Sequence, residues 1–199
     1  MAESETFLFW GTKRIMPKLV LVVVGLPASG KTFVAEMIAR KYRAAMVNSG
    51  DVIRREIKRR GLPYNKKTEA EVSAWFHEKG REIIVGEHAW NMIKGRKNDI
   101  FVIEGLRSYD QLKVIERRAK QKAVIIETCA PLRLRAERSA HRHRFGGTGL
   151  QYIRERDKNE KKRGVGVLLR RAKFRVSNAG TKKDLEKSID KVMKRLVKA

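Results

Sequence analysis

The sequence predicts an α/β fold of three layers, α/β/α, around a five-stranded and mainly parallel sheet. Two observations lead to this prediction. Short runs of β-branched and aliphatic residues alternate with longer stretches that have helical periodicity. The first run, KLVLVVV at residues 18–24, is almost uninterrupted, as in a strand buried on both faces of a parallel sheet. We expect one domain at residues 16–199, preceded by an N-terminal extension at residues 1–15.

The elements that follow the first strand are predicted from local patterns. Apolar residues at helical spacing predict a helix at residues 32–43, and a short strand is expected at residues 44–48. A basic helix is expected at residues 51–60, because Gly61 and Pro63 directly after it are helix-ending residues.

Two further strands lie in the middle of the chain. Apolar positions at helical spacing predict one long helix or two at residues 69–94. The runs IFVIE at residues 100–104 and AVIIE at residues 123–127 predict strands, and the basic stretch at residues 108–121 predicts the helix between them.

The last third of the chain is strongly basic. Helices are expected at residues 131–144 and 150–163, because glycines at positions 146, 147 and 149 interrupt the charged sequence between them. A fifth strand is expected at residues 173–176, and a closing amphipathic helix at residues 181–197.

Composition narrows the classes of partner. Of 199 residues, 47 are Lys or Arg and 22 are Asp or Glu, which gives a formal charge of +25 and favours polyanionic partners. Residues 129–199 alone carry 22 basic and 7 acidic residues. The N-terminus lacks the apolar core of a signal peptide and no run is long enough to span a bilayer, so we expect a cytoplasmic protein with no membrane partner. The single cysteine, Cys129, fits a reducing compartment.

The octapeptide after the first strand matches the phosphate-binding loop pattern G-x-x-x-x-G-K-[ST]. Its residues are Gly25, Leu26, Pro27, Ala28, Ser29, Gly30, Lys31 and Thr32. Backbone N–H groups of such a loop surround the β-phosphate at a helix N-terminus. Lys31 reaches the β- and γ-phosphates, and Thr32 offers a hydroxyl to Mg²⁺. The sequence therefore predicts binding of ATP or GTP, with ATP and Mg²⁺ as the expected cofactors.

A carboxylate that assists the metal is expected at the end of a strand beside this loop. Glu104, which closes IFVIE, is the first candidate, and Glu127, which closes AVIIE, is the second. The alternative for either residue is a strand-end carboxylate that faces water.

Two segments resemble acceptor motifs of nucleoside monophosphate kinases. The sequence NSGDVIR at residues 48–54 is similar to their S/T-G-D-x-x-R segment, which implies that Ser49 and Arg54 contact the acceptor and that Asp51 lies near the metal. The alternative is a helix N-cap followed by solvated arginines. EGLRS at residues 104–108 is similar to their D-G-x-P-R turn, which implies that Arg107 binds the acceptor's phosphate.

Arginines are abundant after the fourth strand. They are Arg133, Arg135, Arg138, Arg142, Arg144, Arg154 and Arg156. We expect residues 133–163 to form a lid that excludes water and stabilises the transferring charge, with Arg142 and Arg156 as the best candidates for catalytic residues beside Lys31 and Arg107. The alternative is a pair of solvated basic helices. His141 and His143 lack further metal ligands nearby and belong to the same basic surface.

Together these motifs resemble the archaeal adenylate-kinase-related P-loop protein family, which is related to nucleoside monophosphate and dephospho-CoA kinases. The resemblance is carried by GLPASGKT, GDVIRR (50–55), VIEGLRS (102–108), RHR (142–144), RDKNE (156–160) and SNAGTKKDLEK (177–187). It implies a P-loop NTPase fold of nucleotide-kinase type, with helical acceptor insertions at about residues 50–95 and a lid at about residues 133–163.

The leading functional hypothesis is transfer of the γ-phosphate of ATP to a nucleotide or nucleotide-like acceptor. The main alternative is an RNA- or ribosome-associated ATPase that uses the basic C-terminal third, and an inactive basic binding module is the third reading. Tyr64, Trp75 and Phe76 lie where a pocket for an acceptor base could form, although aromatic residues at helical spacing are more often core residues.

Overall fold

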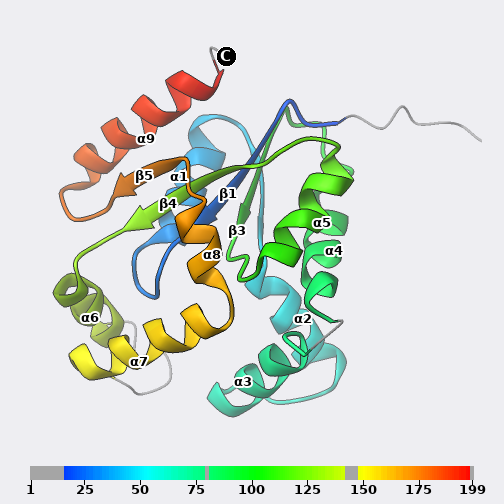
Figure 1. The fold of residues 1–199 in the computed structure, drawn as a ribbon, viewed down its shortest axis with the longest axis vertical. Coiled ribbons are helices and arrows are strands. Elements are labelled where there is room, and N and C mark those ends of the chain that lie inside the picture. The colour runs from blue at the N-terminus through cyan, green and yellow to red at the C-terminus, as the bar shows by residue number, and fades with distance from the viewer. Residues whose placement is uncertain (1–15, 79–80, 142–147, 198–199) are drawn as a thin grey trace, which may run out of the picture.

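The computed structural model describes residues 16–78, 81–141 and 148–197. Within them, five strands form one sheet in the order β2-β3-β1-β4-β5, and every neighbouring pair is parallel (Figure 1). The strands are β1 (Leu19–Val24), β2 (Ala45–Asn48), β3 (Ile100–Glu104), β4 (Val124–Cys129) and β5 (Phe174–Ser177). The predicted five-stranded parallel sheet is confirmed, and the central place of β1 explains its uninterrupted apolar sequence.

Nine helices lie in the described part of the chain. They are α1 (Lys31–Lys41), α2 (Gly50–Arg59), α3 (Lys66–Trp75), α4 (Glu82–Ile93), α5 (Tyr109–Ala119), α6 (Leu132–His141), α7 (Gly149–Lys162), α8 (Val165–Arg170) and α9 (Lys182–Val197). None of these described helices has the length and apolar character that crossing a membrane requires.

Helices cover both faces of the sheet, which gives the three predicted layers (Figure 1). On one face, α1 and α9 bury residues such as Ile38 and Ile189 against the strands. On the other face, α4, α5 and α8 do the same with Trp90, Ile115 and Leu168. Burial of these side chains supplies most of the stabilisation of such a fold.

Two helical pairs stand beyond the carboxyl ends of the strands, α2–α3 on one side and α6–α7 on the other (Figure 1). The first pair packs around an apolar cluster that includes Ile53, Ile57 and Val72, and α4 adds Val85 to it. Ala89 and Trp90 of α4 pack instead in the core of the sheet. Of the segment at about residues 50–95, α2 and α3 therefore form the helical insertion, and α4 belongs mainly to the sheet layers; that this insertion binds an acceptor stays a prediction.

Two local features differ from the expected elements. The apolar stretch at residues 69–94 forms two helices, and α3 begins at Lys66 because Asn65 and Thr68 form a reciprocal capping box. The short helix α8 has no counterpart among the expected elements; its Leu168 side chain is fully buried in the core. Six residues are too few to show clear helical periodicity, so α8 depends on tertiary packing.

Candidate active site

The phosphate-binding loop joins the central strand β1 to α1. Its backbone takes the left-handed conformation at Ala28 and Gly30, with φ of 59° and 88°. A Cβ atom on Gly30 would lie 2.1 Å from Nδ2 of Asn178, and one on Gly25 would lie 2.5 Å from the carbonyl oxygen of Thr128. Close approach therefore requires glycine at both positions, and the left-handed backbone conformation is a second requirement at Gly30.

Two residues from the C-terminal third fix this loop from outside. Arg135 of α6, which is 5% exposed, donates to the carbonyl oxygen of Pro27 at 3.1 Å. Asn178, after β5, donates through Nδ2 to the carbonyl oxygen of Ser29 at 2.9 Å. These bonds engage loop carbonyl groups and not loop N–H groups. The N–H of Ser29 donates to the carbonyl oxygen of Leu26 at 3.1 Å, and the remaining N–H groups of the loop are the ones that suit an anion.

A single cleft runs from the phosphate-binding loop to the α2–α3 pair. The predicted site residues in its lining are Gly25, Pro27, Ala28, Lys31, Thr32, Ser49, Arg54, Glu104, Arg107 and Arg156. The cleft also contains residues to which sequence reasoning gave no role, among them Asn48, Glu69, Ser73, Ser139 and Glu160. The structure thus brings the loop together with three of the predicted arginines, which are Arg54, Arg107 and Arg156.

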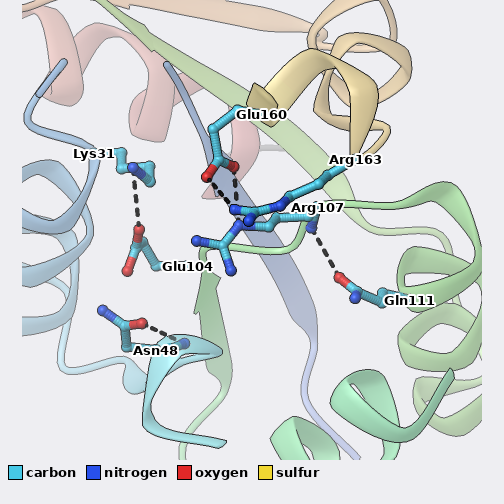
Figure 2. Close-up of polar contacts among 8 residues, drawn as sticks. Lys31, Asn48, Glu104, Arg107, Gln111, Glu160 and Arg163 are labelled. Carbon is cyan, nitrogen blue, oxygen red and sulfur yellow. Dashed lines mark hydrogen bonds and ion pairs between the residues drawn. The ribbon is translucent and has the colours of Figure 1, made fainter. Parts of the chain in front are cut away.

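Lys31 and Glu104 face each other across the loop, because Glu104 ends β3 in register with Val23 of β1. The Nζ atom of Lys31 lies 4.0 Å from Oε1 of Glu104 (Figure 2). Burial lowers the pKa of Lys31, and Glu104 only partly offsets this effect. Burial likewise raises the pKa of Glu104 against the opposing effect of Lys31. Each charged group is thus poorly solvated, which favours an added ligand that supplies charge and hydrogen bonds.

The residues beside Lys31 suit a magnesium ion coordinated mainly by phosphate oxygens. Glu104 is 2% exposed and its Oε2 atom has no hydrogen-bond partner in the described structure. Thr32 lines the same cleft, and its hydroxyl acts to lower the pKa of this carboxylate. One hydroxyl and one carboxylate, with phosphates and water, are a ligand set that Mg²⁺ accepts. Glu127 lies on the other side of β1 and is bound to Arg175 at 2.8 Å.

Ser49 and Arg54 line the cleft as expected, whereas Asp51 does not. The carboxylate of Asp51 pairs with the guanidinium of Arg54, three residues along α2. The structure therefore does not bring Asp51 to the cleft where a metal ligand is expected. Ser49 precedes α2 without a capping hydrogen bond from its side chain, and the side chain of Asn48 accepts from the N–H of Gly50 at 2.7 Å.

Arg107 forms a second ion pair within the cleft. Its Nε donates to Oε2 of Glu160 at 2.9 Å, and its backbone N–H donates to Gln111 at 2.8 Å (Figure 2). Arg163 reaches the other oxygen of Glu160 at 3.3 Å. Burial acts to raise the pKa of Glu160, but the neighbouring Arg107 outweighs it and the pKa lies below its usual range. Glu160 thus stays ionised and links α7 to the β3–α5 turn.

The expected lid is represented by α6 and α7. Arg135 and Asp157 form a bidentate pair between them, with both distances 2.7 Å. Arg156 lines the cleft and lies 5.7 Å from the ring of Tyr152. The predicted catalytic Arg142 lies outside the described residues, as do Arg144 and His143.

Comparison with known proteins shows to which family the chain belongs. Residues 24–147 match a family model described as an AAA domain. A UPF0200 protein from Aeropyrum pernix is 34% identical over 170 residues, which cover 85% of this chain and 89% of that protein. The chain belongs to the AAA-domain family and to the UPF0200 proteins. A UPF0200 protein from Methanosarcina barkeri is 27% identical and covers 87% of this chain and 94% of its own length.

Comparison with solved structures shows which proteins have the same fold as this UPF0200 chain. A shikimate kinase from Acinetobacter baumannii in complex with shikimate has a TM-score of 0.59 at 14% identity, covering 93% of this chain and 95% of its own. A shikimate kinase from Bacteroides thetaiotaomicron has a TM-score of 0.61 at 13% identity, and the match covers 89% of this chain and 98% of that one. At these identities the likeness concerns the fold, which is that of P-loop kinases.

The aromatic residues considered for a base pocket lie outside the lining of the UPF0200 cleft. Phe76 is 2% exposed in the α2–α3–α4 cluster. Trp75 lies between the guanidinium groups of Arg60 and Arg81, at 4.5 and 4.6 Å. Tyr64 is 50% exposed and lines a neighbouring shallow pocket beside α2, to which Arg54 also contributes.

Proposed function

We propose that this protein transfers the γ-phosphoryl group of ATP to a small acceptor that binds between α2, α3 and Arg107. The observation that supports this most directly is the continuity of the cleft, which joins Lys31 and Thr32 to Arg54 and Arg107. Phosphoryl transfer needs chiefly positioning and charge stabilisation, and this cleft is rich in fixed cations. The P-loop kinase fold agrees with that chemistry.

Each part of the cleft has a distinct role in the proposed reaction. The loop N–H groups and Lys31 bind the β- and γ-phosphates, and Arg156 reaches the transferring group from the lid side. Thr32 and Glu104 hold Mg²⁺, which supplies neutralisation of phosphate charge when bound. The acceptor oxygen forms a bond to the γ-phosphorus, the bond to the β–γ bridging oxygen breaks, and ADP leaves with that electron pair.

A coupled assay of ADP release tests the proposal. Purified protein with ATP and Mg²⁺ is given nucleoside monophosphates, dephospho-CoA, hydroxy acids, sugar phosphates and 5′-hydroxyl RNA, one at a time. We expect one class to raise ADP release at least tenfold above the rate without acceptor. Absence of stimulation by every class, in folded protein shown to bind ATP, contradicts the proposal.

A second candidate function has one specific observation in its favour, a row of lysines on α9. Lys183, Lys187, Lys191 and Lys194 recur about every turn of this helix and all are exposed. None of them takes part in an ion pair with another described residue. We call these four side chains the α9 lysine row. Adjacent members are about 4.5 to 6 Å apart along the helix axis, which lets them contact successive phosphates of one strand.

The second candidate is an ATPase that is stimulated by RNA bound to the α9 lysine row. The opposite face of α9 is buried in the core through residues such as Leu185 and Ile189, so this helix has no apolar face to offer a lipid bilayer. The test is the ATPase rate with and without RNA. At least fivefold stimulation that is lost on replacement of the lysine row favours this function, and equal rates contradict it.

A further inference from the structure

The acceptor end of the cleft is balanced in charge although the chain as a whole is strongly basic. Its two lining cations, Arg54 and Arg107, are each paired with a carboxylate, Asp51 and Glu160 respectively, and Glu160 is shared with Arg163. Glu69 also lines this end, and its charge acts on Arg107. A dianionic phosphate monoester placed here therefore meets no excess of positive charge among the described residues, and it is repelled by the carboxylates.

A buried hydroxyl at this end has no hydrogen-bond partner among the described residues. Ser73 of α3 lines the cleft and is 4% exposed, and its Oγ atom makes no hydrogen bond within the described structure. Buried polar groups are nearly always hydrogen-bonded in native proteins, so such a group in a binding cleft indicates a contact that a polar ligand completes. A ligand hydroxyl both donates and accepts, and it suits a serine beside the acid of Glu69.

The described lining of the acceptor end offers no aromatic surface. Its apolar members are aliphatic and include Ile53, Leu106 and Val165. Stacking on aromatic rings is a principal source of affinity for a nucleobase, and the rings of Trp75 and Phe76 face elsewhere. The surface that remains is suited to a small molecule whose hydrogen-bonding groups are distributed along its length.

From these observations we infer that the acceptor is a small polyhydroxylated molecule with at most one negative charge, such as a sugar-derived monocarboxylate. Its hydroxyl groups bind Ser73 and Glu69, and its carboxylate, where it has one, binds Arg54 or Arg107. This inference rests on the proposed phosphotransfer and departs from the nucleotide-like acceptor that the sequence motifs imply. One acceptor hydroxyl attacks the γ-phosphorus, its proton passes to solvent, and ADP leaves with the electrons of the broken bond.

The test separates binding from turnover. Affinities are measured by calorimetry in the presence of Mg²⁺ and a non-hydrolysable ATP analogue. The ligands are gluconate, glycerate and myo-inositol on one side, and glucose 6-phosphate and the four nucleoside monophosphates on the other. We expect at least one of the first three to bind tenfold more tightly than any of the dianions. Tighter binding of a dianion, or no binding of the first three below 10 mM, overturns the inference.

The variant Ser73→Ala tests the proposed contact, and Ser188→Ala on α9 is the matched control. Because the hydroxyl of Ser73 has no hydrogen-bond partner among the described residues, the variant is expected to fold with an unfolding free energy no lower than that of the parent. Its affinity for the hydroxylated ligand is expected to fall about tenfold, whereas the control leaves the affinity unchanged. An unaltered affinity in Ser73→Ala overturns the assignment.

Turnover with the same ligands distinguishes this inference from the proposed function. ADP release with nucleoside monophosphates and not with the hydroxylated ligands overturns the inference and leaves phosphotransfer standing. Absence of ADP release with every ligand overturns phosphotransfer, and the acceptor assignment is then lost with it even if a polyol binds.

Discussion

At the scale of single residues, Lys31 is the group on which the proposed chemistry depends most. It is held beside Glu104 in a setting that lowers its pKa, so bound phosphate is a better partner for it than the protein alone provides. Lys31→Met is expected to reduce ADP release at least 100-fold in the coupled assay. Lys18→Met, which removes an exposed lysine, is the control and should retain the parental rate.

His77 offers a prediction about pH. Burial next to Arg107 and Arg163 lowers its pKa to about 4, from an ordinary value of 6.5. Below pH 6.5 the unfolded chain therefore takes up a proton that the folded chain does not, and the stability of the folded state falls as pH drops from 6.5 to 4. His77→Gln should lose less unfolding free energy over this interval, measured by urea denaturation at each pH.

The control for this measurement is His88→Gln, because His88 is exposed on α4. Its pH dependence of stability is expected to match that of the parent. The same slope for His77→Gln and the parent would contradict a burial-driven effect at position 77.

Sequence predicted those site residues whose role depends on a contiguous motif. The phosphate-binding loop is such a motif, because strand, loop and helix are adjacent in the chain. Ser73, Glu160 and Asn178 could not be assigned roles, since they reach the cleft or the loop only through packing of distant segments. Asp51 differs for a local reason: Arg54 lies one turn further along α2 and pairs with its carboxylate.

At the scale of elements, the Arg135–Asp157 pair joins α6 to α7 and, through Pro27, to the phosphate-binding loop. Both side chains are largely buried, and removal of one partner from such a pair leaves an uncompensated charge. Asp157→Ala is expected to lower the unfolding free energy by about 3 kcal/mol and to raise the KM for ATP. Denaturant unfolding and the coupled assay measure the two effects.

Asp99→Ala is the matched control for this element, because it breaks an ion pair between exposed side chains, Lys18 and Asp99. Such a pair contributes less than about 1 kcal/mol. Equal losses of stability in the two variants would contradict the connecting role of the α6–α7 pair. Two charged stretches separated by glycines predicted both of these helices, whereas no sequence pattern indicated α8, whose six residues are helical because Leu168 packs in the core.

At the scale of the whole molecule, the net charge of +25 and the cleft have different explanations. The described lining contains four cations and three carboxylates, so the cleft takes up little of the excess. The α9 lysine row accounts for a further part, on a surface that packs away from the sheet. Composition gives the total charge. How that charge is divided between the cleft and the surface of α9 can be seen only in the folded chain.

The position of the α9 lysine row leads to a prediction about how RNA affinity depends on salt concentration. If RNA binds the α9 lysine row, the logarithm of its affinity falls linearly with the logarithm of salt concentration. Replacement of the four lysines by glutamine should reduce that slope by about 3, since each phosphate contact contributes about 0.7–0.9. Fluorescence anisotropy with a labelled single strand at several salt concentrations measures the slope. A slope equal to that of the parent would show that RNA contacts another surface.

The two bonds that hold the phosphate-binding loop from outside also bear on how the protein is made. The loop is complete in sequence by residue 32, yet its carbonyl groups are bound by Arg135 and Asn178. A nascent chain that has not yet reached these positions carries the whole motif without the groups that fix its shape. We therefore expect the loop to reach its observed shape late in synthesis, when nearly the entire chain has folded.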